Sequence, residues 1–180
     1  MKRIAAALLA LPLFAAASVT LVASPATAAT LDGTCAASIV LNFSPPVSGL
    51  VLPSPAPVTT STGTGTITTC AFPGGGATTG TFTYALTGNL TCVSAQNVAG
   101  TLDIAWADGT GSHATVTSLV PGLGGAGGAV GLTASITTGR FLGDQVTVAN
   151  IRDPLALATC LTTGLSTATG ITSLTFTQPL

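Results

Sequence analysis

Apolar and polar side chains alternate along much of this sequence with a period of two, and the alternation is clearest over residues 80–92. The positions on one side of the alternation hold Phe82, Tyr84, Leu86, Leu90 and Cys92. The intervening positions hold mainly threonine. Successive side chains of a β-strand point to opposite faces, so this period predicts an antiparallel strand with one buried face and one face in water.

The same pattern recurs along the chain and predicts an all-β domain. Valine, isoleucine and threonine are frequent, and glycine and proline separate the alternating stretches. The pair Asp108-Gly109 favours a tight hairpin turn. Residues 153–161 are compatible with a short helix that starts at Pro154 and equally with a buried strand. We expect strands near residues 36–43, 63–70, 80–92, 98–106, 112–120, 130–138, 145–151 and 170–177.

A proline-rich connection, residues 44–60, separates the first two expected strands. Its five prolines exclude a central strand or a regular helix, so we expect an extended surface segment. About eight short strands with little helix form either two packed sheets or a closed β-barrel. We favour an antiparallel β-sandwich, because a long connection suits a crossing between two sheets, and the closed barrel is the alternative.

The N-terminal residues predict export. Lys2 and Arg3 precede an apolar run over residues 4–22, and Ala26-Thr27-Ala28 matches a signal-peptide cleavage site. We therefore expect residues 1–28 to be a signal peptide and residues 29–180 to form a single all-β domain that is secreted, free or loosely associated with the cell wall. An uncleaved membrane anchor is the alternative, because the apolar run is nearly long enough to span a bilayer.

Four cysteines follow the expected cleavage site. They are Cys35, Cys70, Cys92 and Cys160. An even number of cysteines in an exported domain predicts disulfides, and the chain has no C-x-x-C pair and a single histidine to support a metal site. Three pairings are open. We prefer Cys35 with Cys70 and Cys92 with Cys160, because Cys70 ends a strand expected to return beside the strand that begins at Cys35.

Charge is scarce. Charged residues make up 5% of the chain, against about 25% in an ordinary globular protein. Beyond residue 28 there are five aspartates and two arginines, so no basic patch for nucleic acid can form. A surface of Thr, Ser, Ala and Gly has little charge repulsion, and uncharged strand edges invite pairing with another chain. We therefore expect a protein able to associate with itself or with cell-envelope components.

The stretch PGLGGAGGAV contains a literal G-x-G-x-x-G motif at Gly122, Gly124 and Gly127, and Asp144 follows near the place of a ribose-binding carboxylate. A dinucleotide site needs a helix directly after these glycines to hold the pyrophosphate. Residues 130–138 instead alternate with a period of two and predict a strand. We interpret the motif as a glycine-rich hairpin loop and expect no nucleotide and no other cofactor.

No catalytic group is convincing. Ser112 and His113 are adjacent, and on a strand they would point to opposite faces, so they cannot form a nucleophile–base pair. Asp103 and Asp108 are the nearest pair of carboxylates, and their spacing guarantees no shared site. Trp106 shares a face with apolar residues and is expected in the core rather than on a sugar-binding surface, as is Tyr84 on its own strand. We expect no enzyme, no metal site and no catalytic residue.

Several phrases of the sequence, GTCAASIVLNFSPP, IAWADGT and GRFLGD, together with the Ala/Leu-rich signal and the near absence of lysine, resemble small secreted β-rich proteins of actinobacterial, high-GC Gram-positive type. The resemblance covers most of residues 29–180 and implies no activity. We expect a secreted structural or interaction protein of the cell surface or the medium. An extracellular binding module for a small apolar ligand or a glycan is the alternative.

Overall fold

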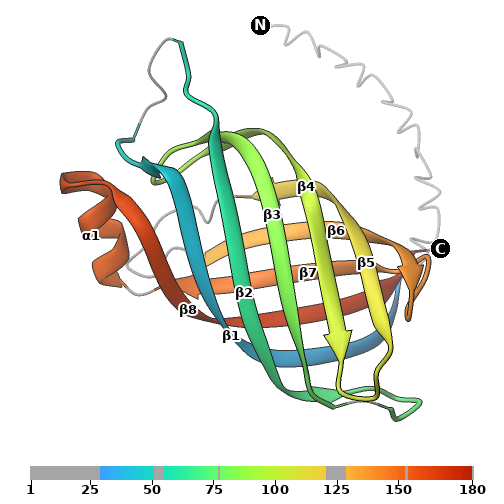
Figure 1. The fold of residues 1–180 in the computed structure, drawn as a ribbon. Coiled ribbons are helices and arrows are strands. Elements are labelled where there is room, and N and C mark those ends of the chain that lie inside the picture. The colour runs from blue at the N-terminus through green and yellow to red at the C-terminus, as the bar shows by residue number, and fades with distance from the viewer. Residues whose placement is uncertain (1–28, 51–54, 77, 121–128, 153, 180) are drawn as a thin grey trace, which may run out of the picture.

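The computed structural model describes residues 29–50, 55–76, 78–120, 129–152 and 154–179. These residues form a closed barrel of eight antiparallel strands in chain order, with β8 paired to β1 (Figure 1). The elements are β1 (Thr30–Val47), β2 (Thr59–Ala71), β3 (Gly80–Leu90), β4 (Ala95–Trp106), β5 (Gly111–Val120), β6 (Ala129–Gly139), β7 (Gln145–Arg152), α1 (Pro154–Thr162) and β8 (Leu165–Gln178). The prediction of an all-β fold is confirmed.

The preference for a sandwich was wrong, and the alternative, a closed barrel, is the observed architecture. The proline-rich connection does not cross between sheets. It joins β1 and β2, which pair directly from Thr34 opposite Ala71 to Ser44 opposite Thr60. A hairpin loop can be long without changing the topology, so the length of this connection carried no information about a second sheet. Pro45 and Pro46 lie where the pairing of β1 with β8 shifts register. Proline has no backbone N–H group to donate, so this irregular position avoids the loss of a hydrogen bond between the strands.

The predicted alternation of apolar and polar residues matches the side chains that point into the barrel and those on its outer surface. Phe82, Leu102 and Phe176 are at most 1% exposed and point inward. The positions between inward-facing residues carry mainly threonine, serine and alanine, so the outer wall carries few charges, among them Asp103. The interior of an eight-stranded barrel is wide enough for side chains to fill it or to hold one small ligand.

Two glycines of β2 make room for aromatic rings inside the barrel. Gly63 lies opposite Tyr84 and Gly65 lies opposite Phe82 in the pairing of β2 with β3. A Cβ atom on either glycine would overlap the opposing ring. The rings therefore lie against the bare backbone of β2.

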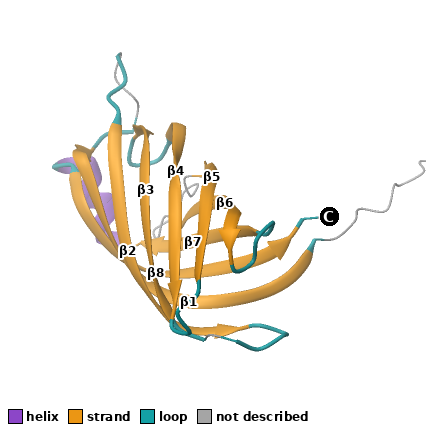
Figure 2. Cartoon of the chain, turned by 45° about the vertical axis from the view of Figure 1, so that its right-hand side comes forward, coloured by secondary structure: helices purple, strands orange, loops and turns teal. Residues whose placement is uncertain are grey.

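The barrel has two different ends. α1 lies at one end, named here the α1 end, beside the connections β1–β2 and β3–β4 (Figures 1 and 2). The hairpin turns β2–β3, β4–β5 and β6–β7 lie at the opposite end, named here the Arg140 end. Within the described part of the chain, no helix has the length and apolar character needed to cross a membrane.

Candidate functional site

A partly enclosed cavity of about 70 Å³ lies inside the barrel toward the α1 end. Inward-facing residues of the strands form its wall, among them Leu41, Leu102 and Val148, and Ala156 and Leu157 of α1 contribute to it. Its polar lining side chains are Ser61, Tyr84, Thr87, Thr91, Ser94 and Asn150. No charged side chain is among the described residues that line it, so the cavity suits an uncharged apolar molecule.

Asn150 is the most unusual residue of this wall. It continues the inward series of β7 after Val146 and Val148 and is 6% exposed. Among the described residues its Oδ1 has no hydrogen-bond partner. Buried polar atoms are normally paired, so a buried acceptor facing a cavity marks a position where a bound molecule can form the missing bond.

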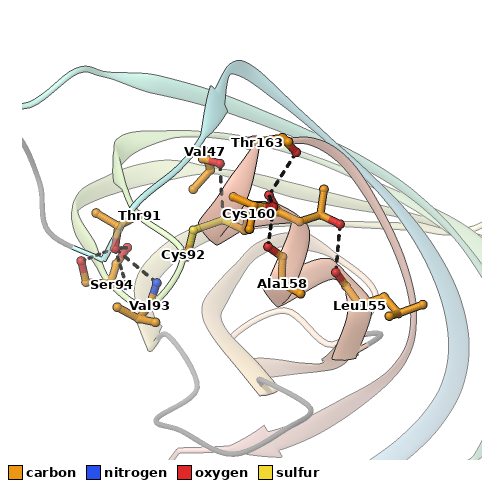
Figure 3. Close-up of a disulfide and its surroundings, with 11 residues drawn as sticks. Val47, Thr91, Cys92, Val93, Ser94, Leu155, Ala158, Cys160 and Thr163 are labelled. Carbon is orange, nitrogen blue, oxygen red and sulfur yellow. Dashed lines mark hydrogen bonds between the residues drawn. A yellow bond between two sulfur atoms is a disulfide. The ribbon is translucent and has the colours of Figure 1, made fainter.

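A disulfide holds α1 over the cavity. Cys160 of α1 is bonded to Cys92 in the β3–β4 connection, and its Sγ lies 3.3 Å from the carbonyl oxygen of Val47 (Figure 3). The β3–β4 connection is itself ordered by Thr91, whose Oγ1 accepts hydrogen bonds from the backbone N–H groups of Val93 and Ser94 at 3.2 and 2.8 Å. These contacts tie the helix to the ends of three strands.

The second disulfide lies within the barrel wall. Cys35 and Cys70 are directly opposite each other in β1 and β2, with their Cα atoms 4.0 Å apart. Both disulfides follow the pairing that the sequence favoured. Two disulfides indicate an oxidising environment.

Aromatic side chains close the Arg140 end. Phe72, Trp106, Phe141 and Phe176 pack together, with ring centroids 4.9 to 5.9 Å apart. The indole N–H of Trp106 donates to Ser112 Oγ at 3.0 Å, and this hydroxyl donates to the carbonyl oxygen of Arg140 at 2.6 Å. Trp106 is 3% exposed, so its expected place in the core is confirmed.

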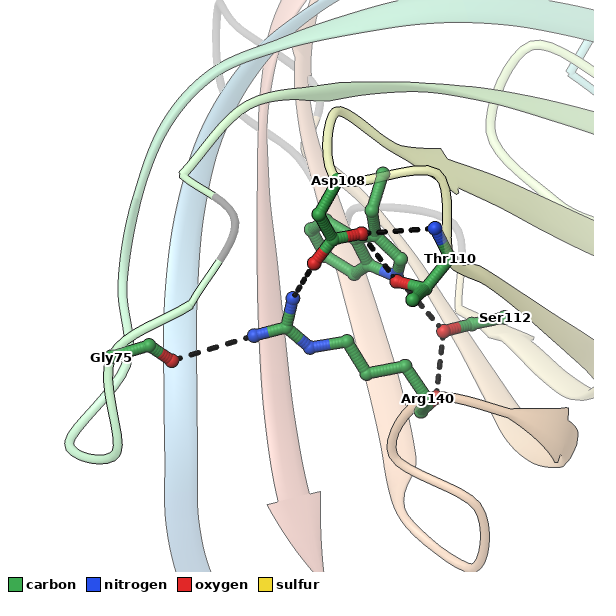
Figure 4. Close-up of polar contacts among 6 residues, drawn as sticks. Gly75, Asp108, Thr110, Ser112 and Arg140 are labelled. Carbon is green, nitrogen blue, oxygen red and sulfur yellow. Dashed lines mark hydrogen bonds and ion pairs between the residues drawn. The ribbon is translucent and has the colours of Figure 1, made fainter.

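Arg140 covers this aromatic cluster from outside. Its guanidinium carbon lies 5.1, 5.3 and 4.9 Å from the ring centroids of Phe72, Trp106 and Phe141. Its Nη1 pairs with Asp108 Oδ2 at 3.1 Å, and its Nη2 donates to the carbonyl oxygen of Gly75 at 3.4 Å (Figure 4). Hydrogen bonds from Thr110, and then the charge of Arg140, lower the pKa of Asp108. Arg140 thus joins three hairpin turns over the aromatic cluster.

Asp144 lies in the β6–β7 connection at the same end and is 4% exposed. Burial raises its pKa to about 6, and the neighbouring carboxyl of Asp32, which shares a hydrogen bond with it, adds to the shift. The sequence singled out Asp144 by its spacing from the glycine motif and gave no sign of a partner more than a hundred residues earlier. Asp144 is therefore protonated at acidic pH.

The residues that the sequence analysis considered as catalytic groups lie in the strands and turns of the barrel. His113 Nδ1 is 2.5 Å from Asp103 Oδ1, across the pairing of β5 with β4. Ser112 points inward to Trp106 while His113 points outward, as their adjacency predicted. Asp103 and Asp108 take different partners and share no site. In the part of the chain that the structure describes, no group of three or more metal-ligating side chains is found.

Gly122, Gly124 and Gly127 lie outside the described residues. The segment that follows them is strand β6 from Ala129, as predicted, so the helix that a dinucleotide site requires is replaced by a strand. Asp144 lies at the Arg140 end, whereas β5 ends and β6 begins at the α1 end. The sequence reasoning missed Asn150, because an asparagine in an alternating strand carries no signal of its own.

No protein-family model, curated protein or solved structure matches this chain.

Proposed function

We propose that this protein is exported through its N-terminal signal peptide and acts outside the cell as a non-enzymatic binding module that holds a small apolar ligand in the barrel cavity. The observation that carries the proposal is the uncharged, mostly apolar cavity at the α1 end. The two disulfides and the apolar N-terminal run support export. Binding is favoured by the apolar surface that a ligand removes from water.

The proposal is tested with cyclopentane and a variant that fills the cavity. Val148→Phe places a larger side chain in the lining, and Thr147→Phe places the same side chain on the outer wall of β7. Binding is followed by NMR titration of the methyl groups of Leu102 and Leu132, both of which line the cavity. A cooperative melting transition shows that each variant is folded.

We expect cyclopentane to shift these methyl signals in the unmodified protein and in Thr147→Phe, and to raise the melting temperature of both. Val148→Phe is expected to abolish the shifts because it occupies the same space. Absence of any shift in the unmodified protein, or equal shifts in both variants, would contradict the proposal.

Self-association at the cell surface is a second candidate function. The side chains of Val40 and Ile171 are 44% and 69% exposed on the outer faces of β1 and β8. Ser38 lies opposite Ile171 and Val40 lies opposite Thr169, so the two apolar side chains are close on one uncharged face. Both line a shallow depression that also includes Gly65. The barrel has no free strand edge, so association would use this face.

A further inference from the structure

Asn150 gives the cavity a chemical preference. Its amide lies among apolar side chains, is 94% buried, and carries an Oδ1 with no hydrogen-bond partner among the described residues. An unpaired acceptor in this position loses the hydrogen bonds it would have in water. A ligand that donates a hydrogen bond there recovers that loss, and a pure hydrocarbon does not.

The donor that fits best is a hydroxyl group. A carboxamide presents an acceptor oxygen and two N–H donors, and a hydroxyl both donates and accepts. A hydroxyl therefore matches either side of the Asn150 amide. It also reproduces the bonds that a water molecule would make to the amide, so its binding does not sacrifice them.

The absence of charged side chains from the described cavity lining excludes ionised fatty acids and amines as ligands. The described lining contains hydroxyl, amide and apolar side chains, and none of them can neutralise an ionised group. An unpaired charge in an apolar site loses far more hydration than a neutral hydroxyl does. The ligand must therefore be neutral.

The size of the cavity sets the scale of the apolar part. An apolar cavity of about 150 Å³ holds benzene, so a partly enclosed cavity of about 70 Å³ accepts a compound of a few heavy atoms, on the order of five at most. A five-membered ring or a short branched chain has this size.

We infer that the cavity binds a small neutral apolar alcohol, with the hydroxyl hydrogen-bonded to Asn150 and the hydrocarbon part packed against the strand side chains. This inference rests on the proposed function, because it uses the same cavity. Asn150 would then act as the residue that selects alcohols over hydrocarbons of equal size.

The test compares cyclopentanol, cyclopentane and cyclopentanecarboxylate at neutral pH on three proteins. These are the unmodified protein, Asn150→Leu, which keeps a similar volume and removes the amide, and Ser61→Ala, which removes another polar group of the lining. Dissociation constants come from the methyl shifts of Leu102 and Leu132. The measured quantity is the affinity of the alcohol divided by that of the hydrocarbon. The two compounds differ in their free energy of transfer from water, and this difference cancels when the ratio is compared between proteins.

We expect Asn150→Leu to lower this ratio about tenfold, and to lower it more than Ser61→Ala does. We expect the carboxylate to bind at least tenfold more weakly than the alcohol. The inference would be overturned by an unchanged ratio in Asn150→Leu, by a larger drop of the ratio in Ser61→Ala, or by tighter binding of the carboxylate than of the alcohol. In each of these cases, binding of cyclopentane would still support the proposed function. If no compound binds, both fail together.

Discussion

Asp144 and Asn150 stand at opposite ends of β7, and each has a buried oxygen without a hydrogen-bond partner among the described residues. The two oxygens have different consequences. At the Arg140 end, burial and the neighbouring Asp32 raise the pKa of the Asp144 carboxyl to about 6, so it responds to pH. At the α1 end, the amide of Asn150 does not titrate and faces a cavity, so it responds to a ligand.

The raised pKa of Asp144 predicts a pH-dependent stability. Its pKa of about 6 in the folded protein exceeds its ordinary value of 3.8, so the folded state binds the proton more tightly than the unfolded state. This contribution to stability is complete below about pH 4 and is lost as the pH rises through about 6. We expect the melting temperature to fall between pH 4 and pH 7, and Asp144→Asn to reduce this fall. Circular dichroism melting curves measure it.

Asp32→Asn provides the comparison. It removes the neighbouring charge but leaves Asp144 buried, and burial is the larger cause of the shift. The pH dependence should therefore weaken in Asp32→Asn and persist in part. A melting temperature that rises from pH 4 to pH 7 in the unmodified protein, and does so less in Asp144→Asn, would contradict the sign of this prediction.

Among the elements, α1 is the one whose position affects both the cavity and the covalent framework. It follows β7, carries Cys160 and contributes Ala156 and Leu157 to the cavity wall. Its bond to Cys92 closes a sequence separation of 68 residues, and the bond between Cys35 and Cys70 closes one of 35. The first bond fixes an element that the ladder of strands does not hold, whereas the second joins strands that are already paired.

Removal of the Cys92–Cys160 disulfide should therefore alter ligand exchange as well as stability. Either disulfide contributes about 2 to 4 kcal/mol to the free energy of unfolding. We expect Cys92→Ala with Cys160→Ala to speed dissociation of cyclopentanol severalfold, because α1 is then free to move from the cavity. Cys35→Ala with Cys70→Ala is the matched control and should lower stability without changing the dissociation rate. NMR exchange measurements on the cavity methyl groups separate the two effects.

Equal dissociation rates in the two double variants would show that α1 does not control access to the cavity.

As a whole molecule, the protein is a ring of strands with a polar, nearly charge-free outer wall. Closure pairs every strand on both sides, which removes the free edges that promote association. The charge content of 5% leaves little electrostatic repulsion between molecules. The outer face around Val40 and Ile171 is then one place where contact between copies would bury apolar surface.

Sedimentation velocity over a wide concentration range, at low and high salt, tests association at this face. If the second candidate function holds, the sedimentation coefficient should increase with concentration, be almost insensitive to salt, and increase less for Ile171→Thr. Thr147→Phe, elsewhere on the outer wall, serves as a control for general surface change. A monomer at all concentrations would exclude self-association and leave the ligand-binding proposal.

Local patterns in the sequence predicted much of this architecture. The period of two identified Phe82, Leu102 and Trp106 as inward-facing residues. The same period showed that a strand, rather than the helix of a dinucleotide site, follows the glycine motif. These features depend on neighbouring positions of one strand, so a single chain segment contains the whole signal. The strands themselves extended beyond their predicted limits, as β1 did to Thr30 and Val47, because pairing with β8 stabilises its polar and glycine-containing ends.

The candidate site was less accessible to sequence reasoning. The lining of the cavity comes from all eight strands and from α1. The alternation places Asn150 inward, but whether an inward asparagine is paired depends on residues distant along the chain. The contacts of Arg140 with Phe72 and Asp108, and the proximity of Asp32 to Asp144, are equally remote in sequence.

The sequence by itself determined that the chain forms strands, which side chains point inward and that its surface carries little charge, because these properties are local or compositional. Only the tertiary structure decided between sandwich and barrel, between helix and strand for residues 154–162, and where an unpaired amide meets a cavity. The pairing of β8 with β1 decides the first of these, and it joins the two ends of the domain. Closure is a property of the whole ring of hydrogen bonds, so no single segment can encode it.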